Sequence, residues 1–204
     1  MSKKPIIVFE GIEGSGKTFH IDNVSSYLKR KKIPFLKIRE PGGSKNSEII
    51  RKLILNNKSS FNKNTDLLLY LSARSENIDL IKKNYKKKII LIDRFIDSTI
   101  AYQHYGMGVD YSIINQINKF LLENIKVNFT FLNTVSHKNM ILRLKERKRL
   151  NRYDKFNTSF YDKVQKGFLK LMRKKKKNSF MIVNSNLPIN TNKEIVLKKL
   201  KNLI

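Results

Sequence analysis

A glycine-rich stretch over residues 9–18, FEGIEGSGKT, constrains this chain more than any other feature of its sequence. It follows an apolar run at residues 6–9 and precedes a segment whose apolar residues have helical spacing. It fits the pattern G-x-x-x-x-G-K-[ST] of a loop whose backbone N–H groups and lysine hold phosphates. A strand before the loop and a helix after it place an anion at a helix N-terminus, which favours negative charge. The stretch therefore predicts an α/β nucleotide-binding fold; the alternative is a glycine-rich turn that binds nothing.

The eight residues of the motif are assigned distinct roles. Lys17 is expected to place its charge on the β- and γ-phosphates of ATP, and the hydroxyl of Thr18 to bind Mg²⁺. The residues expected to hold the cofactor are Gly11, Ile12, Glu13, Gly14, Ser15, Gly16, Lys17 and Thr18.

Strand-like and helix-like segments alternate along the 204 residues. The pattern predicts five strands, at 6–9, 33–38, 88–94, 127–132 and 180–183. It predicts helices at 18–30, after Ser44, and at 66–83, 98–103, 111–123, 136–147, 160–174 and 194–203. Such alternation is typical of a parallel sheet with helices on both faces. We expect an α/β fold of the P-loop type, with the whole chain, 1–204, as a single domain.

The formal net charge of +27, from 43 Lys+Arg against 16 Asp+Glu, raises the question of a nucleic-acid partner. The lysines are spread through every segment, in runs where helices are expected to end or strands to begin. Cations at helix C-termini are mildly favourable. We interpret the charge, with the abundance of Ile and Asn, as the bias of an AT-rich genome, and expect no specific nucleic-acid partner; a polyanion partner is the alternative.

The chain has no cysteine, which excludes disulfides and thiolate metal sites. No apolar run approaches the ~18 residues of a membrane span, so no membrane partner is expected. Residues 1–4 lead directly into the first strand without the apolar region of a signal peptide. We expect a cytoplasmic protein.

The continuous apolar run 89–92, which follows Lys88, indicates a strand buried on both faces, and it ends at Asp93-Arg94. Ligands bind at the carboxyl ends of such strands. Asp93 is therefore expected to partner Mg²⁺ beside the phosphate loop. The alternative is a surface ion pair at a strand end.

Residues 143–152 concentrate four arginines and two lysines around one acid. Phosphoryl transfer spreads negative charge over the oxygens of the transferred group, and mobile arginines can stabilise this charge when a lid closes. We predict a short lid at about 143–156. The alternative is a solvated basic helix end.

Arg74 lies in an otherwise apolar helical segment, and Tyr70 precedes it by one turn, so both side chains share a face. One aromatic ring with one guanidinium donor suits a planar base. The alternatives are an Arg74 that extends to solvent and a Tyr70 that belongs to the core.

Together these segments resemble the thymidylate kinases, a family of P-loop nucleoside-monophosphate kinases. The matching pieces are the phosphate loop, Arg-Glu-Pro-Gly-Gly at 39–43, Ser-Ala-Arg at 72–74, Asp-Arg-Phe-x-x-Ser-x-x-Ala-Tyr-Gln at 93–103 and the arginine-rich lid. The resemblance implies transfer of the γ-phosphoryl group of Mg²⁺-ATP to dTMP, and a homodimer. The alternatives are a kinase acting on another deoxynucleotide or deoxynucleoside, and a nucleic-acid-stimulated ATPase.

The resemblance also implies roles for individual residues. Glu13 contacts the deoxyribose 3′-hydroxyl, and Arg94 and Arg39 clamp the dTMP phosphate. Tyr70 stacks on thymine and Arg74 bonds its exocyclic oxygen. Three further residues shape the pocket: Tyr102 fills the space of a ribose 2′-hydroxyl, and Ser98 and Gln103 line the base.

Residues 12–15 contain none of the loop arginines found in one branch of the family, so the resemblance assigns the catalytic cations to the lid. The catalytic set is then Lys17, Arg94, Arg143, Arg147 and Arg152. The chain departs from the family pattern at Arg152-Tyr153-Asp154, at Phe156 and at Tyr70, where Phe is usual.

Overall fold

The computed structural model describes residues 4–204, so the first three residues of the N-terminal start considered above lie outside it. Its centre is a five-stranded sheet with the order β2-β3-β1-β4-β5, and every neighbouring pair is parallel. The strands are β1 (Ile6–Gly11), β2 (Phe35–Arg39), β3 (Ile89–Asp93), β4 (Phe129–Thr134) and β5 (Phe180–Asn184). The predicted five-stranded parallel sheet is confirmed.

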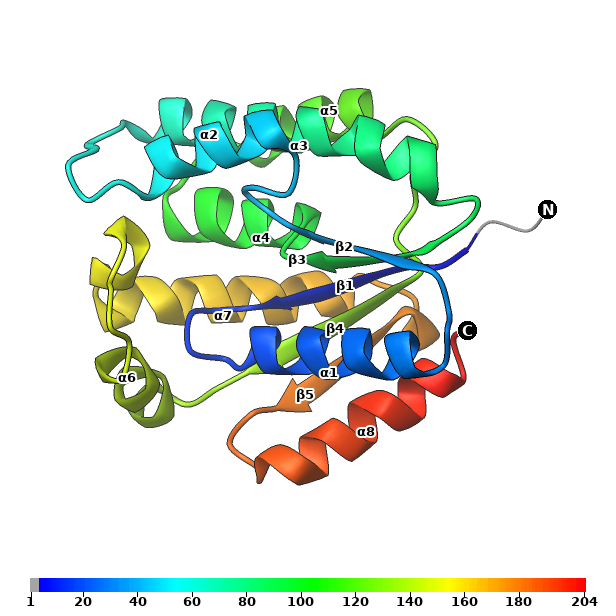
Figure 1. The fold of residues 1–204 in the computed structure, drawn as a ribbon. Helices are drawn as coiled ribbons and strands as arrows, with labels where there is room; N and C mark the ends of the chain where they lie inside the picture. Colours follow the sequence, from blue (N-terminus) through cyan, green and yellow to red (C-terminus); the bar gives the residue numbers. More distant parts are fainter. Residues whose placement is uncertain (1–3) are drawn as a thin grey trace.

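Helices cover both faces of this sheet (Figure 1). Helices α1 (Lys17–Arg30) and α8 (Ile189–Lys201) lie on one face. On the other face and around the sheet edge lie α2 (Lys45–Leu55), α3 (Lys63–Asn84), α4 (Ile96–Thr99), η1 (Ile100–Gly106), α5 (Tyr111–Leu122) and α7 (Thr158–Arg173). Between β4 and α7 the chain forms α6 (His137–Lys145) and the 3₁₀ turn η2 (Arg152–Lys155), and the turn η3 (Lys177–Ser179) precedes β5.

Alternation along the buried strands gives the sheet an apolar core on each face. Ile7 and Phe9 of β1 pack with α1 and α8, while Ile6 and Val8 face the core on the α3 side. Successive side chains of a strand point to opposite faces, so a strand covered by helices on both sides is apolar at every position. This explains the continuous apolar runs of the sequence.

The segment after β3 differs from the regular helix expected at 98–103. Four residues of α-helix are followed by the π-helix η1, in which the N–H of Met107 donates to the carbonyl oxygen of Tyr102 at 2.9 Å. Short π-helical turns occur frequently at functional sites. Helix α7 approaches η1 closely because Gly167 lacks a side chain: a Cβ there would lie 2.6 Å from the ring of Tyr105.

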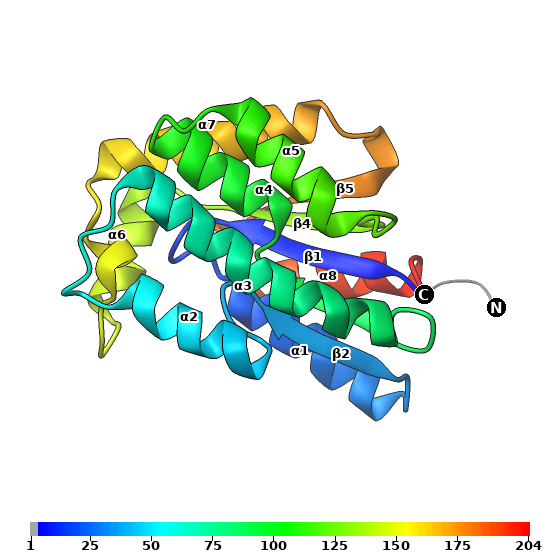
Figure 2. The same cartoon turned by 90° about the horizontal axis from the view of Figure 1, so that it is seen from above.

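The phosphate loop and the lid segment lie together at the carboxyl ends of the strands (Figures 1 and 2). Strands β1 and β3 are neighbours, with Phe9 paired to Asp93, so the end of β3 lies beside the loop, as predicted. Among residues 4–204, no helix is both long and apolar enough to cross a membrane.

Candidate active site

The phosphate loop turns sharply between β1 and α1. Gly11 has φ 142°, and a Cβ there would lie 2.3 Å from the carbonyl oxygen of Asn133 in β4, so only glycine fits. Lys17 folds back over the loop, and its Nζ donates to the carbonyl oxygens of Gly11 and Ile12, each at 2.9 Å. Burial, with Arg94 nearby, lowers the pKa of Lys17 to about 8. The loop thus presents a poorly solvated cation at the wall of a cavity.

Arg94, Glu13 and Tyr102 form a buried polar cluster next to the loop. Arg94 has φ 66°, which turns its side chain back toward the loop, where Nη2 donates to Glu13 Oε1 at 2.7 Å and Nη1 to the carbonyl oxygen of Gly11 at 2.8 Å. The Tyr102 hydroxyl donates to Glu13 Oε2. Burial alone would raise the pKa of Glu13, but Arg94 and Lys17 hold it below its usual value. The cluster is a charged wall that keeps Glu13 ionised.

Two adjoining cavities open on this cluster, and both are lined by Glu13, Arg94 and Tyr153. The first, here called the loop cavity, has a volume of about 160 Å³ and contains Lys17 and Thr18. The second, here called the inner cavity, lies behind Arg94 between α3 and η1. Its remaining walls are Glu40, Tyr70, Arg74, Phe95, Ser98, Thr99, Tyr102 and Gln103.

The structure brings Tyr70 and Arg74 together in the inner cavity, as their spacing predicted. Arg74 does not extend to solvent: it is 1% exposed and pairs with Glu40, its Nε donating to Oε2 at 2.9 Å. Its other nitrogens donate to Thr99 Oγ1 at 2.9 Å and Asn118 Oδ1 at 2.7 Å. A guanidinium held on three sides is a rigid donor for a ligand in the cavity.

Asp93 and Thr18 fit the divalent cation that such a loop implies. Both line the loop cavity beside Lys17, and Asp93 Oδ1 is a buried acceptor without a hydrogen-bond partner among the described residues. No group of three or more His, Cys, Asp or Glu side chains able to hold a metal exists within residues 4–204. Two protein ligands suit Mg²⁺, which keeps several waters and takes its remaining ligands from substrate phosphates.

The predicted lid residues occupy three different places. Arg143 donates to the carbonyl oxygens of Gly14 at 2.9 Å and Ser185 at 2.7 Å, and lines a third cavity of about 220 Å³ with Phe19 and other residues. Arg147 faces the loop cavity and donates to Asp154 Oδ1 at 2.5 Å.

Arg152 and Arg39 depart from the roles expected for them, since neither lines the loop cavity or the inner cavity. The Arg152 guanidinium pairs with buried Asp66, and Arg39 pairs at the surface with Glu48, its Nη2 lying 2.9 Å from Oε2. Arg51 of α2, which sequence reasoning missed, lines the loop cavity and donates to the carbonyl oxygen of Pro41 at 2.6 Å.

Glu40 and Tyr153 were also missed as cavity residues. The sequence held a weak signal for both: Glu40 belongs to the Arg-Glu-Pro-Gly-Gly segment, and Tyr153 to a departure from the family pattern. Their partners Arg74 and Asp66 lie 34 and 87 residues away along the chain, so no local pattern connects them.

A parallel sheet with a phosphate loop after its central strand, and a second cavity adjoining that loop, define a P-loop nucleoside-monophosphate kinase fold. Comparisons with known proteins agree. The family described as "Thymidylate kinase" matches residues 9–196. This chain belongs to the thymidylate kinase family.

Individual relatives cover nearly the whole chain. A thymidylate kinase of a Sulfurihydrogenibium species is 37% identical over 198 residues, covering 96% of each chain. That of Thermosipho africanus is 37% identical, covering 87% of this chain and 88% of the relative. The crystal structure of thymidylate kinase from Ehrlichia chaffeensis matches with a TM-score of 0.76 and 31% identity, covering 98% of this chain and 99% of that one.

Proposed function

We propose that this protein transfers the γ-phosphoryl group of ATP to dTMP, yielding dTDP and ADP. The observation that carries the proposal is the pair of adjoining cavities that share Glu13 and Arg94. One contains the phosphate loop, and the other is lined by the ring of Tyr70 and by the side chains of Arg74 and Gln103, which suit a nucleoside base. A phosphate bound at Arg94 is then common to both cavities, which is the arrangement that transfer between two nucleotides requires.

In the inner cavity, dTMP places its base between Tyr70 and the η1 wall, with Arg74 donating to an exocyclic oxygen. Glu13, held ionised by Arg94, accepts from the deoxyribose 3′-hydroxyl. The Tyr102 ring, 5.1 Å from the Arg94 guanidinium, fills the space beside the sugar and leaves no room for a 2′-hydroxyl. The cavity therefore selects a deoxynucleoside monophosphate.

In the loop cavity, Lys17 and the backbone N–H groups of the loop hold the phosphates of ATP. Thr18 and Asp93 would hold Mg²⁺, which would neutralise the negative charge of the phosphates. Arg143 and Phe19 line the third cavity, beyond the loop, and flank the adenine there.

Transfer needs no strong base, because the accepting phosphate is already anionic. The protein contributes position and charge: Arg94 holds the acceptor oxygen in line, while Lys17 and Arg147 stabilise the charge that develops on the transferred group. Arg51 adds a cation to the same cavity.

An acceptor panel tests the proposal. Purified protein with ATP and Mg²⁺ is given dTMP, dUMP, dCMP or thymidine, and the products are separated by chromatography. The expected result is dTDP, with dTMP the preferred acceptor and Lys17→Ala as the inactive control. A preference for another acceptor favours the related kinase, whereas ATP hydrolysis that rises with added DNA, without dTDP, favours the ATPase.

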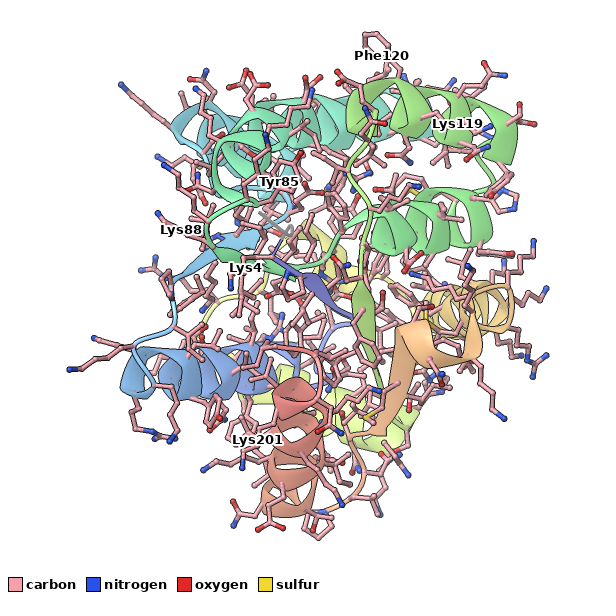
Figure 3. The ribbon with its side chains drawn as sticks, turned by 90° about the vertical axis from the view of Figure 1, so that its right-hand side faces the viewer. Lys4, Tyr85, Lys88, Lys119, Phe120 and Lys201 are labelled. Atoms are coloured by element: carbon pink, nitrogen blue, oxygen red, sulfur yellow. The ribbon has the colours of Figure 1, made fainter. Side chains whose placement is uncertain are left out.

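We also propose that the protein is a homodimer through the outer face of α3 and α5. Leu68, Ile113 and Phe120 are 55%, 49% and 79% exposed on these two packed helices, and Phe120 projects from the molecule in Figure 3. Exposed apolar patches of this kind mark interfaces. Light scattering is expected to show a dimer. Phe120→Glu is expected to dissociate it, whereas the control Ile204→Glu, at an exposed residue elsewhere, is expected to leave it intact. If the unmodified protein is monomeric at micromolar concentration, the proposal is overturned.

A further inference from the structure

Asp66, in the first turn of α3, is a buried charged residue that the reaction described above does not use. It is 1% exposed and lines neither the loop cavity nor the inner cavity. Its carboxylate nevertheless accepts from three side chains: the Arg152 guanidinium, the Tyr153 hydroxyl and, at 3.3 Å, Gln103 Nε2. A carboxylate is buried only where such donors compensate for its lost hydration.

The three donors come from two parts of the site. Arg152 and Tyr153 belong to η2 in the lid segment, and Gln103 to the π-helix η1. Gln103 and Tyr153 both line the inner cavity, and their polar atoms lie 3.4 Å apart. The Asp66 carboxylate on α3 thus connects Gln103, in the wall of the inner cavity, to Arg152 and Tyr153 of the lid segment.

The same contact sets the orientation of the Gln103 amide. An ionised carboxylate only accepts hydrogen bonds, so the amide nitrogen of Gln103 must face Asp66. Its carbonyl oxygen is then the atom left for a ligand. An acceptor there complements thymine, which carries a hydrogen on N3, and opposes cytosine, whose N3 is itself an acceptor.

Tyr153 completes the connection on the lid side. Its ring packs edge-on against Tyr70, with centroids 5.8 Å apart, and against Tyr102 at 5.9 Å. The hydroxyl that bonds Asp66 is the group by which this chain differs from the Phe expected at the position. The residue at which the lid departs from the family pattern, Tyr153, is therefore a direct partner of the buried Asp66 carboxylate.

We propose that Asp66 is a positioning residue that fixes Gln103 for a base with a protonated N3 and couples that choice to the seating of the lid through Arg152 and Tyr153. This rests on the proposed function. Tyr153 also lines the loop cavity, but neither Asp66 nor its three donors line the third cavity, where the adenine is placed, so the main effect is expected on the nucleotide that accepts the phosphoryl group.

Steady-state kinetics of Asp66→Asn and Tyr153→Phe test the inference. Asp66→Asn is nearly isosteric, but its amide can face Gln103 with either atom. We expect KM for dTMP to rise and the preference for dTMP over dCMP to fall, each by about tenfold, the loss expected for one charge-assisted hydrogen bond. KM for ATP is expected to stay within about twofold. Tyr153→Phe is expected to change the same two quantities in the same direction, by less, and to add nothing in the double variant.

Asp162→Asn, which removes an exposed carboxylate paired with His137, is the matched control. If Asp66→Asn does not fold, as judged by thermal melting, Tyr153→Phe decides alone. The inference is overturned if both variants keep the KM for dTMP and the dTMP-to-dCMP preference of the unmodified protein. It is also overturned if the variants lose only thermal stability. A protein that fails to phosphorylate dTMP before any substitution overturns the proposed function instead.

Discussion

Binding of ATP is expected to take up a proton at alkaline pH, because Lys17 is poorly solvated before the phosphates arrive. Burial and the neighbouring Arg94 lower its pKa to about 8, against an ordinary value of 10.5. Phosphates beside Nζ favour the charged form and return the pKa toward that ordinary value. The bound state therefore holds its proton more tightly than the free state, so affinity is greatest below about pH 8 and falls as the pH rises.

The size of the effect follows from the two values. At about pH 9 only about one tenth of the free protein carries the Lys17 proton, while nearly all of the complex does, which corresponds to about 0.9 proton taken up. Between about pH 7 and about pH 9 the Kd for ATP is expected to rise about tenfold, equivalent to about 1.4 kcal/mol. ATP itself contributes little, since phosphate monoesters lose their second proton near about pH 6.

Titration calorimetry in buffers of different ionisation enthalpy measures the proton uptake directly. Adenosine, which has no phosphates, is the control ligand and is expected to bind without it. Lys17→Arg is the control variant, because a guanidinium does not titrate in this range. Uptake near zero with ATP at about pH 9, or equal uptake with adenosine, would refute the reasoning.

Three further predictions concern catalysis, selection of the sugar and stability. Arg147→Ala is expected to lower kcat by about 10²- to 10³-fold with KM for dTMP nearly unchanged, as when one charge-stabilising donor is removed; Lys148→Ala is its control, and a change confined to KM would contradict the assignment. Tyr102→Ala is expected to raise the use of ribothymidine monophosphate relative to dTMP in a competition assay, and an unchanged ratio would remove the steric argument. Burial, with Asp97 nearby, raises the pKa of Glu10 from 4.5 to about 7. The folded state then keeps a proton that the unfolded chain has lost, so the free energy of unfolding falls as the pH rises from about 4.5 to about 7, by about 3 kcal/mol. Chemical denaturation is expected to show a smaller fall in the free energy of unfolding over this pH range for Glu10→Gln than for the unmodified protein. An identical pH dependence in both proteins would count against this role of Glu10.

Which parts of the site were predictable depended on how far apart the interacting residues lie along the chain. The phosphate loop is a contiguous motif, and Asp93 follows a continuous apolar run, so local pattern was enough to predict that the two lie side by side. Tyr70 and Arg74 are one helical turn apart, and their shared cavity followed from the period of the helix. The same local reasoning could not show that Arg74 pairs with Glu40.

The sequence by itself determined the class of fold and the place of the phosphate-loop motif between β1 and α1, because hydrophobic alternation and loop chemistry act over a few residues. Only the tertiary structure decided which cations line the loop cavity. Arg39 and Arg51 both flank the same loop, yet Arg39 pairs with Glu48 at the surface while Arg51 enters the cavity. Arg152 lies 86 residues from Asp66 and is held by it. Arg39 and Arg152 pair with carboxylates, whereas Arg51 donates to the carbonyl oxygen of Pro41, and tertiary packing rather than sequence spacing brings these partners within reach.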